Sequence, residues 1–149
     1  MTPQYWTKIE VEIVANASTY KELRSVALAV IERMPRPLVQ VCGPISTGGA
    51  GSLEENLRRF NEAISFLKKE GQHVFDQMPF EASIQKIKDI EEPNAKYAMG
   101  ILEQFYLPIF ETKAIEVFYF LPNWESSTGA RWEREQAERL GMNIIDFDF

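Results

Sequence analysis

The apolar residues of this chain follow helical spacing in some segments and extended spacing in others. They recur every three or four positions in residues 20–34, 52–71, 80–93, 95–109 and 128–140. This spacing places them on one face of a helix. The sequence therefore predicts a helix in each segment, with a kink at Pro108 because proline cannot continue the hydrogen bonding of a helix.

Short apolar runs between these helices predict strands. Residues 38–42, 73–75, 115–121 and 143–147 are compact, apolar and bounded by glycine, proline or polar residues. The segment from Tyr5 to Ile13 fits either a short strand or the start of a helix, and its pattern does not decide between them.

Polar capping residues define where two of the helices begin and end. Thr19 with Glu22, and Ser52 with Glu55, have the spacing of capping boxes. Pro35 and Pro37 follow the first of these helices. Gly71 follows the second, at the position where glycine commonly ends a helix.

The order of these segments predicts an α/β fold. Strands that alternate with helices form a mostly parallel sheet that is covered on both faces. In such sheets, ligands bind beyond the carboxyl ends of the strands, at the loops that lead into the helices. We expect one domain, with residues 1–36 as an N-terminal extension and residues 37–149 as the core.

Composition excludes several classes of protein. The chain of 149 residues is 45% hydrophobic and 26% charged, which is typical of a globular domain. Its net charge of −6 argues against a nucleic-acid polymer as partner. No apolar run is long enough for a membrane span, and no secretory signal opens the chain, so we expect a cytoplasmic protein. One cysteine and one histidine cannot form a disulfide or a typical zinc site, and no cofactor or metal is expected.

A glycine-rich loop follows the strand at residues 38–42. It contains Gly43, Pro44, Ile45, Ser46 and Gly48, and it leads into the helix that begins after residue 52. Small residues let the backbone approach a ligand closely, and the free N–H groups of a helix start favour an anion. The alternative is a loop that only connects two elements, because glycine-rich turns often do no more.

A second loop, residues 121–128, leads into a helix that carries Glu133. On this helix Glu133 shares a face with Ala130, Ala137 and Leu140, so its carboxylate lies on the side that packs against the sheet. A glutamate on such a face is expected to have either a pairing partner or a functional role. Two alternatives remain open, namely an active-site carboxylate or a buried ion pair with Arg134 or another base.

Together, the two loops resemble the nucleoside 2-deoxyribosyltransferase superfamily, which includes the 2'-deoxynucleoside 5'-phosphate N-hydrolases. The similar motifs are Gly43-Pro44-Ile45-Ser46 and Ser127-x-Gly129-x-x-x-Glu133, within about residues 38–147. The form Leu121-Pro122-x-Trp124-x-x-Ser127-x-Gly129-Ala130 is closest to an uncharacterised branch. The resemblance implies a flavodoxin/Rossmann-like three-layer sandwich with four to five strands, plus an extra N-terminal helix.

The resemblance also implies a retaining mechanism in which Glu133 attacks the anomeric carbon and expels the base. In this family a serine at the position of Ser127 indicates a 5'-monophosphate, whereas an aspartate there indicates a nucleoside. Ser127 can equally be a plain N-cap. Expected substrate-binding residues are Gly43, Pro44, Ile45, Ser46, Gly48, Trp124, Ser127, Gly129 and Ala130. Trp124 can stack on a base or pack under its loop.

One expected residue is missing. The family carries an aspartate that helps the base to leave, and the matching region near residues 107–109 contains no acid. Asp76 is the first candidate to replace it, followed by Glu116 and Glu125, although each of these also fits a structural or solvated role.

The leading expectation is therefore an N-glycosidase that hydrolyses a (deoxy)nucleoside 5'-monophosphate. Alternatives are a base-exchanging nucleoside 2-deoxyribosyltransferase and a non-catalytic protein that binds or senses nucleotides. Its partner would be a small nucleotide or nucleoside, not a membrane. The resemblance also implies a homodimer or higher homo-oligomer.

Overall fold

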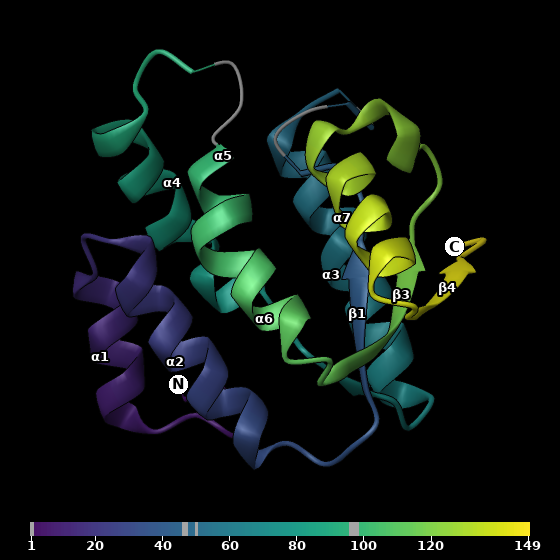
Figure 1. Ribbon diagram of the computed structural model, residues 1–149, viewed down its shortest axis with the longest axis horizontal. Helices are drawn as coiled ribbons and strands as arrows, with labels where there is room; N and C mark the ends of the chain where they lie inside the picture. Colours follow the sequence, from purple (N-terminus) through teal and green to yellow (C-terminus); the bar gives the residue numbers. More distant parts are fainter. Residues whose placement is uncertain (1, 46–47, 50, 96–98) are drawn as a thin grey trace. The chain divides into compact units, whose positions relative to one another are not determined.

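The structure, a computed structural model, describes residues 2–45, 48–49, 51–95 and 99–149 (Figure 1). The chain forms two compact units, Met1–Met34 with Gln77–Thr112, and Pro35–Asp76 with Lys113–Phe149. The described part of the first unit is helical, and the second contains the sheet. Each unit is described by itself below.

A parallel sheet forms the centre of the second unit. Its strands are β1 (Leu38–Cys42), β2 (His73–Val74), β3 (Ile115–Phe120) and β4 (Asn143–Asp146). They lie in the order β2-β1-β3-β4, and all pairs are parallel. Each predicted strand segment is thus a strand, and the predicted α/β fold with a mostly parallel sheet is confirmed.

The helices of this unit lie on opposite faces of the sheet (Figure 1). Helix α3 (Leu53–Lys69) connects β1 to β2, and helix α7 (Thr128–Arg139) connects β3 to β4. The two connections step along the sheet in opposite directions. Since such crossovers are right-handed, opposite steps place the two helices on opposite faces. The unit therefore has three layers, as the flavodoxin/Rossmann-like expectation requires.

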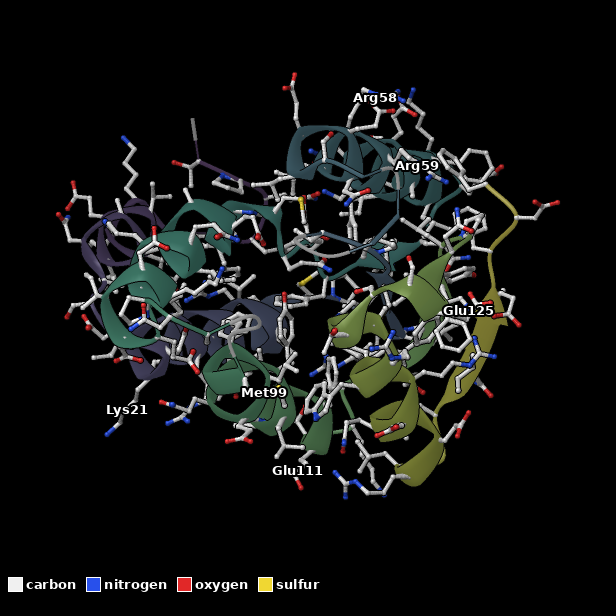
Figure 2. The ribbon with its side chains drawn as sticks, turned by 90° about the horizontal axis from the view of Figure 1, so that it is seen from above. Lys21, Arg58, Arg59, Met99, Glu111 and Glu125 are labelled. Carbon is white, nitrogen blue, oxygen red and sulfur yellow. The ribbon has the colours of Figure 1, made fainter. Side chains whose placement is uncertain are left out.

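Local interactions explain where α3 begins and which face it exposes. The Ser52 hydroxyl accepts a hydrogen bond from the Glu55 N–H at 3.2 Å, as the capping pattern predicts. On the exposed face, Arg58 pairs with Glu55 and Glu62 (Figure 2). The opposite face of α3 buries Phe60, Ala63, Ile64 and Leu67. All of β1 is buried as well, as expected for a central strand covered on both sides.

The first unit consists of short helices. They are α1 (Lys8–Asn16), α2 (Tyr20–Arg33), the 3₁₀ turn Met78–Phe80, α4 (Glu81–Glu91), α5 (Met99–Ile101), the π-helix Leu102–Tyr106 and α6 (Leu107–Glu111). The segment that the sequence left open is helix α1. Thr7 and Glu10 form a complete capping box at its start, which stabilises a helix at this point. The N-terminal region thus has two helices, where the sequence predicted one.

The helical stretch around Pro108 is not a regular α-helix, and the kink that the sequence predicts there stays a prediction. Because proline has no N–H, the carbonyl of Gln104 loses the donor that an α-helix would supply. The chain passes through the π-helix before α6, and the Arg24 Nη1 donates to the Gln104 carbonyl at 3.1 Å. This helical stretch begins at Met99, after residues 96–98, which lie outside the described part.

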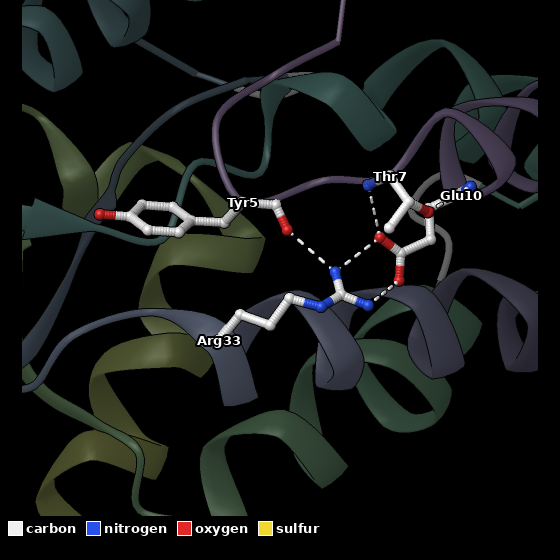
Figure 3. Close-up of polar contacts among 4 residues, drawn as sticks. All are labelled: Tyr5, Thr7, Glu10 and Arg33. Atoms are coloured by element: carbon white, nitrogen blue, oxygen red, sulfur yellow. Dashed lines mark hydrogen bonds and ion pairs between the residues drawn. The ribbon is translucent and has the colours of Figure 1, made fainter.

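An ion pair joins α1 to α2 (Figure 3). Arg33 Nη1 and Nη2 donate to the two carboxylate oxygens of Glu10 at 2.7 and 2.8 Å, and Nη1 also donates to the Tyr5 carbonyl. The Thr7 N–H donates to Glu10 as well. The hydrogen bond from Arg33, ahead of that from Thr7, lowers the pKa of Glu10 from 4.5 to about 2, although burial acts against it. The bidentate pair therefore favours the ionised form of Glu10 in the folded chain.

We predict that Glu10→Gln lowers the free energy of unfolding by about 1–3 kcal/mol at pH 7. A folded pKa below the unfolded value gives stability that is present above about pH 4.5 and is lost as the pH falls toward 2. The difference between wild type and variant should therefore shrink in acid, as urea unfolding at several pH values would measure. Glu12→Gln, on the exposed side of α1, is the control. A difference that does not depend on pH would contradict the ionic role of Glu10.

Candidate functional site

The order of the strands identifies one edge of the sheet as the candidate site. From β1 the chain steps outward to β2, and from β3 it steps the other way to β4. The carboxyl ends of β1 and β3 are therefore neighbours at the point where the order reverses, which is where ligands bind in open α/β sheets. The glycine-rich loop follows β1, and the second loop follows β3.

The two loops are in direct contact. The Gly49 N–H donates to the Ser126 Oγ at 2.8 Å, and the Ser126 hydroxyl donates to the Asn123 carbonyl at 2.6 Å. A Cβ on Gly48 would clash with the Ser126 hydroxyl and carbonyl oxygens, so only glycine permits this approach. Two segments about 75 residues apart thus form one structure.

Asn56, in the first turns of α3, holds the glycine-rich loop from the other side. Its Nδ2 donates to the carbonyls of Ile45 and Gly48 at 3.0 and 3.1 Å, and the side chain is buried. Gly43 and Pro44 are buried at the end of β1. Ser46, another predicted binding residue, lies outside the described residues.

Glu133 is buried against β1. Only 8% of the residue is exposed, and its Oε2 accepts a hydrogen bond from the Gln40 Nε2 at 3.1 Å. The Cys42 thiol also donates to this carboxyl group. Because Cys42 is the last residue of β1, the carboxyl group lies near the start of the glycine-rich loop.

Arg134 is not the ion-pair partner of Glu133, although the sequence left that possibility open. It pairs with Asp146 at 2.5 Å and more distantly with Glu138. Its guanidinium also lies over the ring of Trp124, 4.4 Å from the centroid. Among the described residues, the interactions that affect the pKa of Glu133 include no guanidinium or ammonium group.

Burial raises the pKa of Glu133 from 4.5 to about 8, while the hydrogen bonds from Cys42 and Gln40 act in the opposite direction. Burial likewise raises the pKa of the Cys42 thiol, and the Glu133 charge adds to the rise. Both groups are therefore mostly protonated at neutral pH. A carboxyl group that titrates near pH 8 can act as a proton donor below that pH and as a nucleophile above it.

Ser127 is the N-cap of α7. Its Oγ accepts the Ala130 N–H at 3.2 Å, and Ser127, Gly129 and Ala130 are all buried. A hydroxyl that accepts in this way still has its own proton to donate. The N-cap interpretation is therefore correct, and it does not exclude contact with an anion.

Trp124 lies on the side of its loop that faces β4. Its ring contacts Phe120 at 5.7 Å between centroids and lines a groove of about 450 Å³ with Asp146 and Phe147. Packing and the Arg134 contact thus fix this ring, whereas the Ser126 contact joins the same loop to the glycine-rich loop.

The three candidate acids are dispersed. Asp76 follows β2 and pairs with Lys68 at 3.2 Å. Glu116 is exposed near the amino end of β3, away from the loops at its carboxyl end. Glu125 is exposed on the second loop (Figure 2). None of the three is among the groups that affect the pKa of Glu133.

Sequence reasoning missed Gln40, Asn56 and Ser126. A signal was present for Gln40, because a polar residue inside a buried apolar strand requires a partner. Asn56 and Ser126 occur in polar surroundings, where their contacts with the glycine-rich loop leave no pattern in the sequence.

No helix in the described ranges is long and apolar enough to cross a membrane. Those ranges also contain no group of three or more His, Cys, Asp or Glu side chains placed to hold a metal ion.

We predict that Glu133 makes the stability of the protein depend on pH. Its folded pKa of about 8 exceeds the unfolded value of 4.5, so its contribution is fully present below pH 4.5 and is lost as the pH rises through 8. Between pH 5.5 and pH 9, wild type should lose about 3 kcal/mol relative to Glu133→Gln in urea unfolding. Glu135→Gln, exposed on the same helix, should follow wild type. Parallel curves for wild type and Glu133→Gln would disprove the buried, uncharged carboxyl group.

Comparison of the sequence with known proteins identifies the family of the chain. Searches of curated proteins and of solved structures give no match. One protein family matches residues 38–146, which include every strand of the sheet, both loops and Glu133. Since this match covers most of the 149 residues, the chain belongs to the family described as a domain of unknown function, DUF4406.

Proposed function

We propose that this protein is an N-glycosidase that hydrolyses the base–sugar bond of a (deoxy)nucleoside 5'-monophosphate through a covalent intermediate on Glu133. We also propose that it is related to the nucleoside 2-deoxyribosyltransferase superfamily, through the motifs of its two loops. The observation that carries the proposal is the buried Glu133 carboxyl group, which has an amide and a thiol as partners and lies beside the glycine-rich loop.

The reaction needs an ionised carboxylate at C1' of the sugar. A Glu133 oxygen forms a bond to C1', the bond to the base breaks, and its electron pair leaves with the base nitrogen, which takes up a proton. Water then attacks C1' of the glycosyl ester, which frees Glu133 and the sugar phosphate. Because the pKa of Glu133 is raised to about 8, the competent form becomes more populated as the pH rises toward that value.

A 5'-phosphate fits the start of α7. Ser127 is neutral and caps the helix, and the N-terminal end of a helix favours an anion. A carboxylate at this position would repel a phosphate. This contrast supports a nucleotide rather than a nucleoside as the substrate.

A non-catalytic nucleotide-binding protein is the second candidate. Asp76, Glu116 and Glu125 are not among the groups that interact with Glu133 in the described structure, so no assigned acid protonates the leaving base. A protein that binds nucleotides without turnover would show thermal stabilisation by monophosphates and no base release.

We predict that wild type releases free base from at least one ribo- or deoxyribonucleoside 5'-monophosphate, and that Glu133→Ala abolishes this while keeping nucleotide binding. Chromatographic detection of the base, with calorimetry for binding, measures both. Loss of the nucleophile should reduce kcat by at least about 10³-fold. Glu135→Ala, exposed on the same helix, is the matched control. Wild-type turnover in Glu133→Ala would refute the nucleophile, and transfer of the sugar to an added second base would identify a transferase.

We predict that Ser127→Asp shifts the preference, measured as the ratio of kcat/KM values, from nucleotide toward nucleoside by about tenfold or more. Aspartate caps helices as well as serine does, so the fold should be retained. Ser127→Asn, which also caps but carries no charge, should keep the nucleotide preference. An unchanged ratio in Ser127→Asp would remove the argument for a phosphate at this helix start.

A further inference from the structure

Gln40 is an unusual residue for its position. It lies in the middle of β1 between Val39 and Val41, and no part of it is exposed. A buried amide loses its hydrogen bonds to water, so an apolar side chain would be the stable choice in such a strand. Stability of the strand alone therefore does not explain a glutamine here.

Only one end of the Gln40 side-chain amide forms a hydrogen bond. Its Nε2 donates to the Glu133 Oε2 at 3.1 Å and lies 3.9 Å from the Cys42 Sγ. Its Oε1 has no partner among the residues that the structure describes. A buried acceptor without a partner costs a free energy comparable to what a single hydrogen bond contributes, so the two effects largely offset each other. Gln40 therefore orients Glu133 but adds little to the net stability of the fold.

We propose that Gln40 is a positioning residue, which holds Oε2 of Glu133 and thereby leaves Oε1 as the oxygen that attacks the sugar. The inference rests on the proposed function for the reaction that Glu133 performs. Gln40 is fully buried whereas Glu133 retains some exposure, so Gln40 acts through Glu133 and does not touch the substrate. During attack, Oε1 forms the bond to C1', and Oε2 becomes the carbonyl oxygen of the ester, which still accepts the hydrogen bond from Gln40.

The same hydrogen bond favours the ionised carboxylate. The interactions that affect the pKa of Glu133 are its burial, the Cys42 thiol and the Gln40 amide. The cation that follows it on the helix, Arg134, is engaged by Asp146. Among the residues that the structure describes, Gln40 and Cys42 are the polar groups that oppose the effect of burial.

The test is a titration of Glu133 in wild type and in Gln40→Met, which keeps the length of the side chain and removes the donor. Carbon-13 NMR of labelled glutamate side chains, assigned by the loss of a signal in Glu133→Gln, follows the ionisation directly. We expect the midpoint in Gln40→Met to rise by about one pH unit, the effect of losing one hydrogen bond to a charged group. Gln136→Met, a glutamine on α7 that accepts from Arg139, should leave the midpoint unchanged.

Activity gives the second measurement. In Gln40→Met the kcat should fall and the acid limb of the pH–rate profile should move upward with the NMR midpoint, while KM stays within about twofold. A variant with an unchanged Glu133 midpoint overturns the inference, whatever its activity. A third outcome is possible, in which the Glu133 midpoint rises in Gln40→Met but wild type releases no base. That result supports the inference that Gln40 positions Glu133, and it contradicts only the proposed function.

A measurement on wild type covers the case in which Gln40→Met does not fold. The side-chain amide signals of Gln40 should shift with the same midpoint as Glu133, and Glu133→Gln should remove that response. Amide signals that do not respond to the ionisation of Glu133 also overturn the inference.

Discussion

The hydrogen bond between Gln40 and Glu133 is the constraint on which the candidate site depends. It joins the strand that ends in the glycine-rich loop to the helix that begins after the second loop. Gln40 and Glu133 are 93 residues apart in the chain, and only the pairing of β1 with β3 brings them together. A carboxyl group in this position is costly, since burial disfavours its charge, and the described groups that oppose this effect, Gln40 and Cys42, are neutral donors. Glu133 can therefore change its charge near neutral pH, whereas Glu10, with a guanidinium partner, stays ionised.

Contacts between the two loops add further constraints at the carboxyl ends of β1 and β3. Ser126 and Asn56 hold the glycine-rich loop from two elements, and Gly48 permits the close approach. Gly48 and Gly49 are thereby held next to the loop that leads into α7, where Ser127 is the cap. A ligand bound there would meet backbone and hydroxyl groups that are already oriented, which lowers the entropy cost of binding. The site is preorganised by interactions between main-chain and short polar groups rather than by charge.

Much of the fold follows from the sequence because its signals are local. The apolar runs at β1 and β3 and the capping residues Ser52 and Ser127 identify the strands and helix starts directly. The apolar pattern of residues 5–13 is ambiguous between strand and helix, whereas the spacing of Thr7 and Glu10, a capping box in the structure, favours a helix. The site was predictable in its loops and in the burial of Glu133. The partners of Glu133 were not, because strand pairing brings them from a distant part of the sequence. Trp124 illustrates the same limit, since the position of its ring depends on Arg134 and Phe120.

The charge state of Glu133 separates the proposed functions on physical grounds. A retaining glycosidase needs the carboxylate, whereas the burial of Glu133 favours the protonated acid. Binding of a phosphate near Ser127 would add negative charge and favour the acid further, which suits a protein that binds without turnover. In the proposed reaction, however, the sugar would develop positive charge at C1' as the base departs, and that charge would favour the carboxylate at the moment when it is needed. A buried carboxyl group held by neutral donors responds strongly to that charge, because burial leaves few other groups to screen it. The burial that keeps Glu133 protonated at neutral pH would, in the proposed reaction, strengthen its stabilisation of an oxocarbenium-like transition state.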